Sequence, residues 1–157
     1  MLKYILTFLI SMVPIVELRG GIPFGVGMGV KWYHAVPICM IGNMIPVPFI
    51  YFFARKILEW GADKPFIGKF FSWCLKKGHS GGEKLKAKAG KGMFLALLLF
   101  VGIPLPGTGA WTGTLAASLL DLEFKKSIVA VMLGVVLAAV IITAATLLSF
   151  GAFSAIK

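Results

Sequence analysis

Charge is scarce in this sequence, and its scarcity excludes most soluble architectures. Only 14% of the residues are charged and 59% are hydrophobic, with a mean hydropathy of +0.92. Soluble domains average about 25% charged and about 45–50% apolar residues. A chain of 157 residues forms one domain at most, and its interior is too small to bury so much apolar side chain. We therefore predict an all-α integral membrane protein, with residues 1–157 forming a single membrane domain.

Cysteine and histidine are also scarce. Cys39 and Cys74 lie in unrelated segments, as do His34 and His79. Because disulfide frameworks and metal sites need grouped ligands, we predict neither of them, and no cofactor. The sequence also lacks a nucleophile–base pair, paired carboxylates and a phosphate-binding loop followed by Lys-Ser/Thr. We predict that the chain is not an enzyme.

The positive charges are concentrated in one segment. Ten of the sixteen lysines and arginines, and three acidic residues, fall between Arg55 and Lys91. They lie between hydrophobic blocks, which indicates contact with lipid headgroups and not with nucleic acid. We predict a basic linker over 57–90, with an amphipathic helix at Pro65–Lys77 in the headgroup plane. The positive-inside rule then predicts that segment 55–91 is cytoplasmic and that both termini are outside.

Two hydrophobic runs are long enough to cross a bilayer, whose core requires about 20 apolar residues in a helix. Residues 127–156 carry no charge, and we predict a transmembrane helix over 127–150. Residues 35–54 are the second predicted transmembrane helix. Its prolines at positions 37, 46 and 48 must bend it, which membrane helices tolerate where neighbours satisfy the freed carbonyls.

Two further apolar regions are each divided by turn-forming residues. Residues 4–30 are divided at Glu17–Pro23, and residues 92–120 at Pro104–Gly109. Each arm has about 11–13 residues and makes roughly 18 Å of helix. That length is too short to cross a core about 30 Å thick. We therefore predict two re-entrant hairpins, each of which enters the membrane and leaves it on the same side.

The two halves of the chain match. A hairpin followed by a spanning helix occurs in residues 1–56 and again in residues 91–157. Each half crosses the membrane once, so we predict two inverted repeats. Small residues at a spacing of four, which allow close helix packing, follow both turns. These are Gly21, Gly25 and Gly29, and then Gly109, Gly113 and Ala117. Two spanning helices are little material to enclose a pathway, and we expect a homodimer or larger assembly.

Glu17 and Arg19 lie within an apolar hairpin, where ionisable residues are functional candidates. Gly20 and Gly21 allow a tight turn and close approach of a ligand. We expect Pro23 to lie in the first turn of the next helix, whose free N–H groups favour an anion. In the alternative interpretation, Glu17 and Arg19 pair with each other or with hairpin backbone and only hold the turn.

The second hairpin has a matching cluster without charge, formed by Gly107, Thr108, Gly109, Trp111 and Thr112. In inverted-repeat transporters the substrate lies where the ends of such half-helices meet. We therefore predict one substrate site built from both clusters.

The chemistry of the side chains suggests their roles. Arg19 is a permanent cation that binds phosphate or carboxylate through two N–H groups. Glu17, held away from water, would accept and release the coupling proton. Thr108 and Thr112 add hydroxyl groups, and Trp111 adds an amphipathic surface.

The clusters Glu17–Pro23 and Pro104–Gly109 resemble those of the small multi-drug export protein family, and the resemblance covers essentially the whole chain. That family is similar in design to the larger DedA membrane proteins. The resemblance implies two re-entrant hairpins packed against spanning helices. Through the DedA proteins it also implies transport of polyprenyl phosphate or phospholipid carriers, with coupling to protons. DedA proteins carry arginine in the second hairpin too, whereas residues 92–120 carry no charge here.

Three functions follow as hypotheses. The leading one is flipping of an anionic lipid phosphate, such as undecaprenyl phosphate, across a bacterial or archaeal cytoplasmic membrane, because Arg19 and two positive helix ends suit an anion. The second is a small drug–proton antiporter that exports cationic compounds and uses Glu17. The third is a membrane scaffold without transport, in which both charges serve stability alone.

Overall fold

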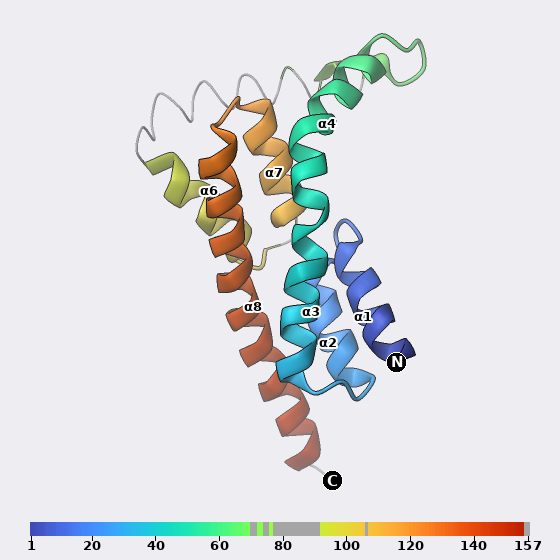
Figure 1. The fold of residues 1–157 in the computed structure, drawn as a ribbon, viewed down its shortest axis with the longest axis vertical. Coiled ribbons are helices and arrows are strands. Elements are labelled where there is room, and N and C mark those ends of the chain that lie inside the picture. The colour runs from blue at the N-terminus through green and yellow to red at the C-terminus, as the bar shows by residue number, and fades with distance from the viewer. Residues whose placement is uncertain (70–71, 74–75, 77–91, 106, 156–157) are drawn as a thin grey trace.

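The computed structural model describes residues 1–69, 72–73, 76, 92–105 and 107–155. The elements of this part of the chain are helices (Figure 1). They are α1 (Leu2–Met12), α2 (Glu17–Gly27), α3 (Trp32–Met44), α4 (Pro46–Ala62), α6 (Met93–Gly102), α7 (Ala110–Leu119) and α8 (Phe124–Ala155). The all-helical prediction is confirmed for the described residues. The predicted headgroup-plane helix, Pro65–Lys77, lies partly outside them.

The first helical hairpin, α1 and α2, turns earlier than the sequence predicted. Pro14 disfavours helical backbone at Val13, which is extended (φ −71°, ψ 131°) and ends α1. Ile15 then has φ 76°, which reverses the chain direction. The turn therefore lies at 13–16, and Glu17 begins α2. The predicted turn cluster Glu17–Pro23 is helical instead, and Pro23 lies inside α2, not in the first turn of a later helix.

Small residues allow the helices of the first half to approach closely. A Cβ atom added at Gly25 would lie 2.7 Å from Thr7 Cγ2 of α1. One added at Gly21 would lie 3.0 Å from Cys39 Sγ of α3. The predicted stripe therefore serves packing within the chain at these two positions. Gly29 lies beyond α2, at φ 76°, where the chain turns towards α3.

The predicted span over 35–54 corresponds to two helices that meet at Ile45. Pro46 and Pro48 cannot donate backbone hydrogen bonds to the preceding turn, which explains the break at this point. Trp32–Ala54 is long and apolar enough to cross a membrane, as is Phe124–Gly151 within α8. Both predicted spanning segments therefore coincide with candidate spans, and α4 continues beyond the first of them to Ala62.

The arms of the second hairpin separate after the turn at 103–109. In contrast to α1 and α2, which pack against each other, α6 packs mainly on α8 and α7 mainly on α4. A Cβ atom added at Gly134 of α8 would lie 2.7 Å from Val101 Cβ, which is how α6 approaches α8 so closely. On the other side, the Ser118 hydroxyl donates to the Tyr51 carbonyl at 2.7 Å and joins α7 to α4.

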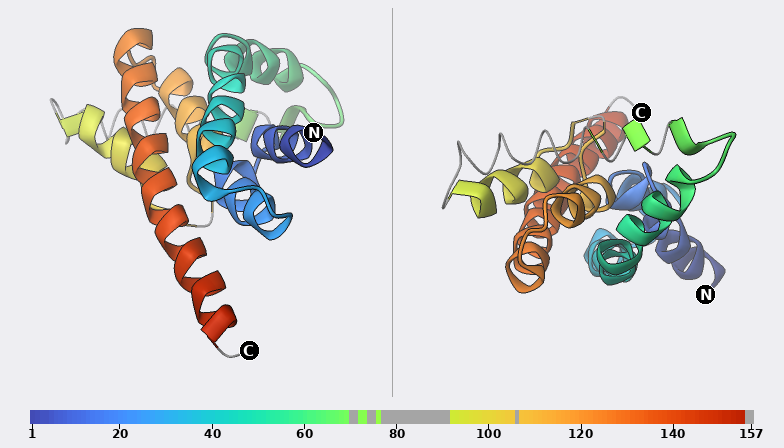
Figure 2. Two further views of the ribbon diagram at one scale, coloured as in Figure 1. Left: turned by 60° about the horizontal axis from the view of Figure 1, so that its bottom comes forward. Right: turned by 90° about the horizontal axis from the view of Figure 1, so that it is seen from above.

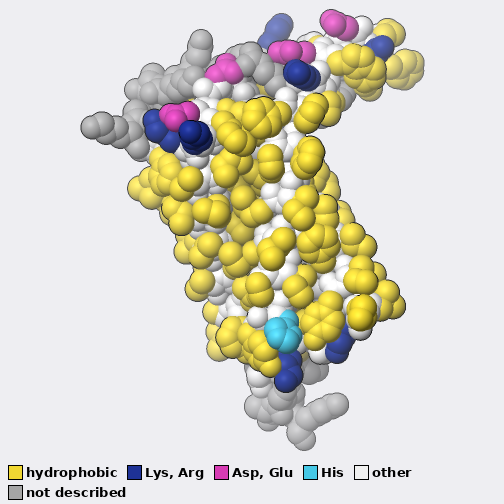
Figure 3. Space-filling model, viewed as in Figure 1, with side chains coloured by type: hydrophobic (Ala, Val, Ile, Leu, Met, Phe, Trp, Pro, Cys, Tyr) yellow, Lys and Arg dark blue, Asp and Glu magenta, His cyan; other side chains and the backbone are white. Residues whose placement is uncertain are grey.

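The two hairpins point towards each other along the length of α8. Figure 1 shows α1 and α2 beside the lower half of the molecule, and α6 and α7 beside the upper half. In both views of Figure 2, α6 and α1 lie on opposite sides of the molecule. On the face drawn in Figure 3, hydrophobic side chains cover the middle and charged side chains gather at the two ends. This distribution suits a bilayer. The re-entrant depth of the hairpins and the relation between the two halves as inverted repeats stay predictions.

Candidate site where the two hairpin turns meet

Glu17 joins the first hairpin to the second. Its carboxylate accepts the backbone N–H of Ala110 at 3.3 Å and that of Trp111 at 3.0 Å. The side chain is buried, with 3% of its surface exposed. The first N–H groups of a helix have no partner within the helix, and they carry partial positive charge. The anion that the N-terminus of α7 favours is therefore a side chain of the protein itself.

Gly109 makes this contact possible. Its backbone (φ 138°, ψ −174°) lies in a region that is essentially restricted to glycine. An added Cβ atom would also lie 2.7 Å from Glu17 Oε1 and 2.8 Å from Glu17 Cδ. Any other residue at position 109 would therefore strain the turn and displace the carboxylate.

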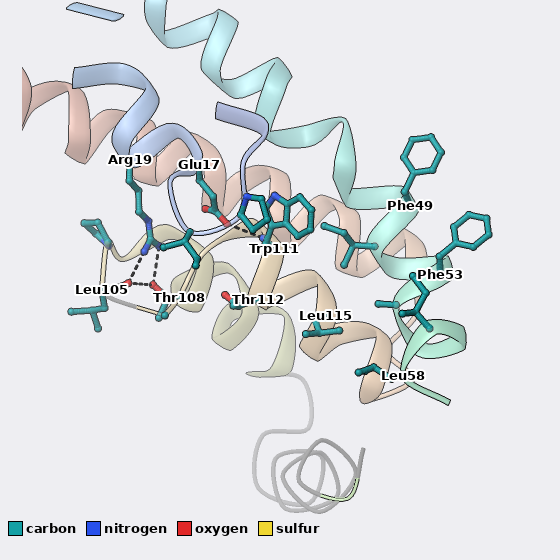
Figure 4. Close-up of a pocket in the computed structure, with 17 residues that line it drawn as sticks. Glu17, Arg19, Phe49, Phe53, Leu58, Leu105, Thr108, Trp111, Thr112 and Leu115 are labelled. Carbon is teal, nitrogen blue, oxygen red and sulfur yellow. Dashed lines mark hydrogen bonds between the residues drawn. The ribbon is translucent and has the colours of Figure 1, made fainter. Parts of the chain in front are cut away.

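Arg19 binds the other side of the same turn. Its guanidinium donates to the carbonyl of Leu105 at 2.5 Å and to the Thr108 hydroxyl at 2.8 Å (Figure 4). Longer bonds, at 3.3 and 3.4 Å, reach the carbonyls of Ile103 and Val101 at the end of α6. These carbonyls are the negative end of α6, and a cation is favoured there.

The two charges are thus held by backbone dipoles of the opposite hairpin. Glu17 lies at the start of α7 and Arg19 at the end of α6, which suits the dipole of each helix. In the described part of the chain, Glu123 and Lys126 form an ion pair, whereas Glu17 and Arg19 do not. The alternative interpretation made from the sequence named two kinds of partner for these charges, each other or hairpin backbone. The backbone contacts are observed, and the backbone belongs to the second hairpin. These contacts do not decide between a structural role and a substrate site.

A cavity of about 840 Å³ opens beside these contacts. Glu17, Arg19, Thr108 and Thr112 form its polar part, and apolar side chains form most of the remaining wall (Figure 4). The other lining residues are Pro14, Ile15, Phe49, Ile50, Phe53, Ala54, Ile57, Leu58, Pro104, Leu105, Gly107, Trp111 and Leu115. The cavity is therefore charged where Glu17 and Arg19 line it and apolar over most of its remaining wall.

The structure brings most of the predicted site residues together. Seven of the nine lie at the cavity or the contact between the turns: Glu17, Arg19, Gly107, Thr108, Gly109, Trp111 and Thr112. Gly20 and Gly21 are not among the residues that line the cavity. An added Cβ atom at Gly20 would instead meet Val16 at 2.5 Å, and one at Gly21 would meet α1 and α3.

The wall that α4 contributes to the cavity was not predicted from the sequence. Phe49, Phe53 and Ile57 occur at intervals of four residues, and Ala54 and Leu58 follow at the same spacing. Residues four apart lie on one face of a helix. This periodicity could have identified the face, but nothing in the sequence indicated that it would lie against the second hairpin and not against lipid.

The described residues contain no group of three or more His, Cys, Asp or Glu side chains that could hold a metal ion.

The observations so far define a helical protein with two candidate membrane-spanning helices and an amphipathic cavity between two helical hairpins. A family model described as "Putative small multi-drug export protein" matches residues 17–141, which is most of the chain. The chain belongs to this family. No curated protein and no solved structure matches it. Family membership and the two apolar helices together indicate a membrane protein.

Proposed function

We propose that the protein is a transporter, and that it moves an amphipathic anion of the lipid-phosphate type through the cavity beside the hairpin turns. The supporting observation is the difference in access between the two charges. Glu17 is 3% exposed and both its oxygens accept backbone N–H groups, whereas the Arg19 side chain is only partly buried. Arg19 is therefore the charge that a substrate in the cavity can reach.

A second hydrogen-bond donor at the cavity supports a substrate with an anionic headgroup. The indole Nε1 of Trp111 is buried and has no hydrogen-bond partner among the described residues, and Trp111 lines the cavity. Buried polar atoms in folded proteins generally have partners, so a substrate oxygen is a suitable one. Together with the guanidinium, the indole N–H would bind phosphate oxygens.

The apolar wall of the cavity favours a substrate in which an apolar chain is attached to that headgroup. Phe53, Leu58 and Leu115 extend the cavity away from the charged residues. Ligand pockets of this size are mostly apolar, with a few polar groups that fix orientation. Polyprenyl phosphate has this division of polarity, and the similarity in design between the small multi-drug export family and the DedA proteins suggests the same substrate class.

We also propose that Glu17 couples transport to protons. A carboxylate accepts strong hydrogen bonds from N–H groups, and a protonated carboxyl group accepts weaker ones. Protonation of Glu17 would therefore weaken its contact with Ala110 and Trp111. This contact and that of Arg19 join the two hairpins, so its loss would leave the turns held by Arg19 alone. The weaker connection would favour opening of the cavity towards the opposite side of the membrane.

Efflux of lipophilic cations is the second candidate, and the family description favours it. The aromatic rings of Phe49, Phe53 and Trp111 in the same cavity are suitable surfaces for a cation. In this case Glu17 would have to exchange its backbone partners for the cation. The two candidates therefore predict opposite roles for Glu17 and Arg19.

The test is transport in proteoliposomes, with a fluorescent short-chain polyprenyl phosphate in one assay and a fluorescent lipophilic cation in the other. We expect flipping of the lipid phosphate, with about a tenfold or greater loss in Arg19→Gln, because hydrogen bonds to a charged group contribute about 1.5–3 kcal/mol. The Glu17→Gln variant should flip the lipid phosphate at a rate that does not depend on pH. Transport of the cation alone would overturn the first proposal in favour of the second.

A matched pair of variants tests whether the cavity is the pathway. Ala54→Phe adds a ring inside the cavity, whereas Val140→Phe adds one on an exposed face of α8. We expect a loss of transport only in Ala54→Phe, at equal folded yield. If folded wild-type protein moves neither probe, the scaffold hypothesis replaces both candidates.

Topology and assembly complete the proposal. We propose cytoplasmic exposure of the basic segment 55–91, external termini and a homodimer. Labelling of single cysteines introduced at positions 2 and 125, in a variant that lacks Cys39 and Cys74, tests the orientation in cells. Labelling of both from the same side would contradict it.

A further inference from the structure

A second cavity, of about 530 Å³, lies between α6 and the beginning of α8. It shares no lining residue with the cavity at the hairpin turns. Its wall is formed by Met93, Phe94 and Leu97 of α6, with Leu122, Glu123, Lys126, Ser127 and Ala130 from the start of α8. The apolar part thus comes from both helices, and the polar part comes from the first turn of α8 and the residue before it.

The polar part contains one charge of each sign. Lys126 Nζ lies 2.7 Å from Glu123 Oε2, and both side chains are largely exposed, at 74% and 57%. Such exposed pairs contribute little to stability, so the two groups remain available to a ligand. The N-terminus of α8, at Phe124, adds partial positive charge beside Lys126.

Ser127 is an independent indication of a ligand. The residue is 3% exposed and lines the cavity, and its hydroxyl has no hydrogen-bond partner within the described part of the chain. In helices, a serine hydroxyl commonly bonds the carbonyl four residues earlier, as Ser149 does with Ala145 at 2.8 Å. Ser127 does not make this bond. A buried hydroxyl without a partner is unfavourable, which suggests that an external group bonds it.

The cavity lies at a charged end of the molecule. Glu123 and Lys126 precede the apolar run of α8, so they stand where the candidate span begins. In Figure 3, charged side chains gather at the end of the molecule where α8 begins, next to the hydrophobic surface. A ligand in this cavity would therefore have its polar group at the level of lipid headgroups and its apolar part beside the hydrophobic band.

We propose that this cavity binds a phospholipid whose headgroup is zwitterionic and carries a primary amine, as in phosphatidylethanolamine. The lipid phosphate lies near Lys126 and the start of α8, and the ammonium group donates to Glu123. The hydroxyl of Ser127 donates to a phosphate or ester oxygen, and an acyl chain lies along Leu97 and Ala130. One positive and one negative side chain match a zwitterion better than an anionic lipid. This site does not depend on the proposed transport function.

Lipid binding to the purified full-length protein in detergent tests the proposal, with native mass spectrometry as the measurement. Phosphatidylethanolamine, phosphatidylcholine and phosphatidylglycerol are compared at equal chain length. Choline lacks N–H donors and glycerol lacks the cation, so we expect about tenfold weaker binding of both, the effect of one lost charge-assisted hydrogen bond. Equal binding of the three lipids would overturn the proposal.

Adjacent lysines provide a matched control. Lys126 lines the cavity and Lys125 does not, although both are exposed. We expect Lys126→Ala and Glu123→Gln to lose the preference for phosphatidylethanolamine, and Lys125→Ala to keep it. An equal loss in both lysine variants would indicate attraction by surface charge only and overturn the site. Dimer formation that excludes lipid would also overturn it, because a second copy would then occupy the cavity.

Discussion

Replacement of Glu17 by Gln tests whether the carboxylate joins the two hairpins. The carboxylate accepts N–H groups from Ala110 and Trp111, and hydrogen bonds to a charged group contribute about 1.5–3 kcal/mol each. A Gln side chain offers one acceptor oxygen and one NH₂ donor. The Gln oxygen would accept one of the two N–H groups in a neutral hydrogen bond. The other N–H group would face the Gln NH₂, which is also a donor, in a buried site.

We therefore expect Glu17→Gln to lower the free energy of unfolding by about 2–4 kcal/mol, the sum of about 1 kcal/mol for lost charge and about 1–3 kcal/mol for an unpaired donor. Glu17→Ala, which leaves both N–H groups unpaired, should lower it further. The assay is unfolding by sodium dodecyl sulfate in mixed micelles, followed by circular dichroism. Helical content of the folded variants serves as the measure of matched folding.

The same substitution at Glu123 is the control. Its carboxylate is 57% exposed and pairs with Lys126, and exposed pairs contribute about 0.2–1 kcal/mol. If Glu17→Gln lowers the free energy of unfolding no more than Glu123→Gln does, the carboxylate of Glu17 does not join the two hairpins. Its contact with α7 would then contribute no more than an ordinary surface charge.

Three further substitutions test the local structure and packing of the helices in the same assay. Gly109→Ala should lower the free energy of unfolding by about 2–4 kcal/mol, from strain at φ 138° and the clash with Glu17, and an unchanged value would contradict the described turn. Gly151→Ala, where an added Cβ atom meets nothing within 4 Å on α8, should instead raise it by about 0.5–1 kcal/mol, and a decrease would indicate a neighbour at this position. Ser118→Ala removes the 2.7 Å bond to the Tyr51 carbonyl and should lower the free energy of unfolding by about 1 kcal/mol; no change would mean that this bond does not hold α7 to α4.

Composition and periodicity predicted the helical class and both candidate spans, because membrane segments are recognised by length and apolarity alone. They also identified the two charged residues, since Glu17 and Arg19 are conspicuous in an apolar segment. The position of the first turn was wrong by several residues. Glycines and Pro23 suggested a turn, but Pro14 ends α1 first, and a proline is tolerated within α2.

The sequence by itself determined that this protein is helical, which segments suit a membrane and which residues are too polar for apolar surroundings. Only the tertiary structure decided what those polar residues bind. Glu17 and Arg19 are separated from their partners by 82 to 94 positions, and local patterns contain no information about such pairs. The tertiary structure also decided that α4 forms a cavity wall, since an apolar helix face packs equally well against lipid or protein. Long-range packing places the hairpin turns together, and with them the helix ends whose dipoles hold both charges.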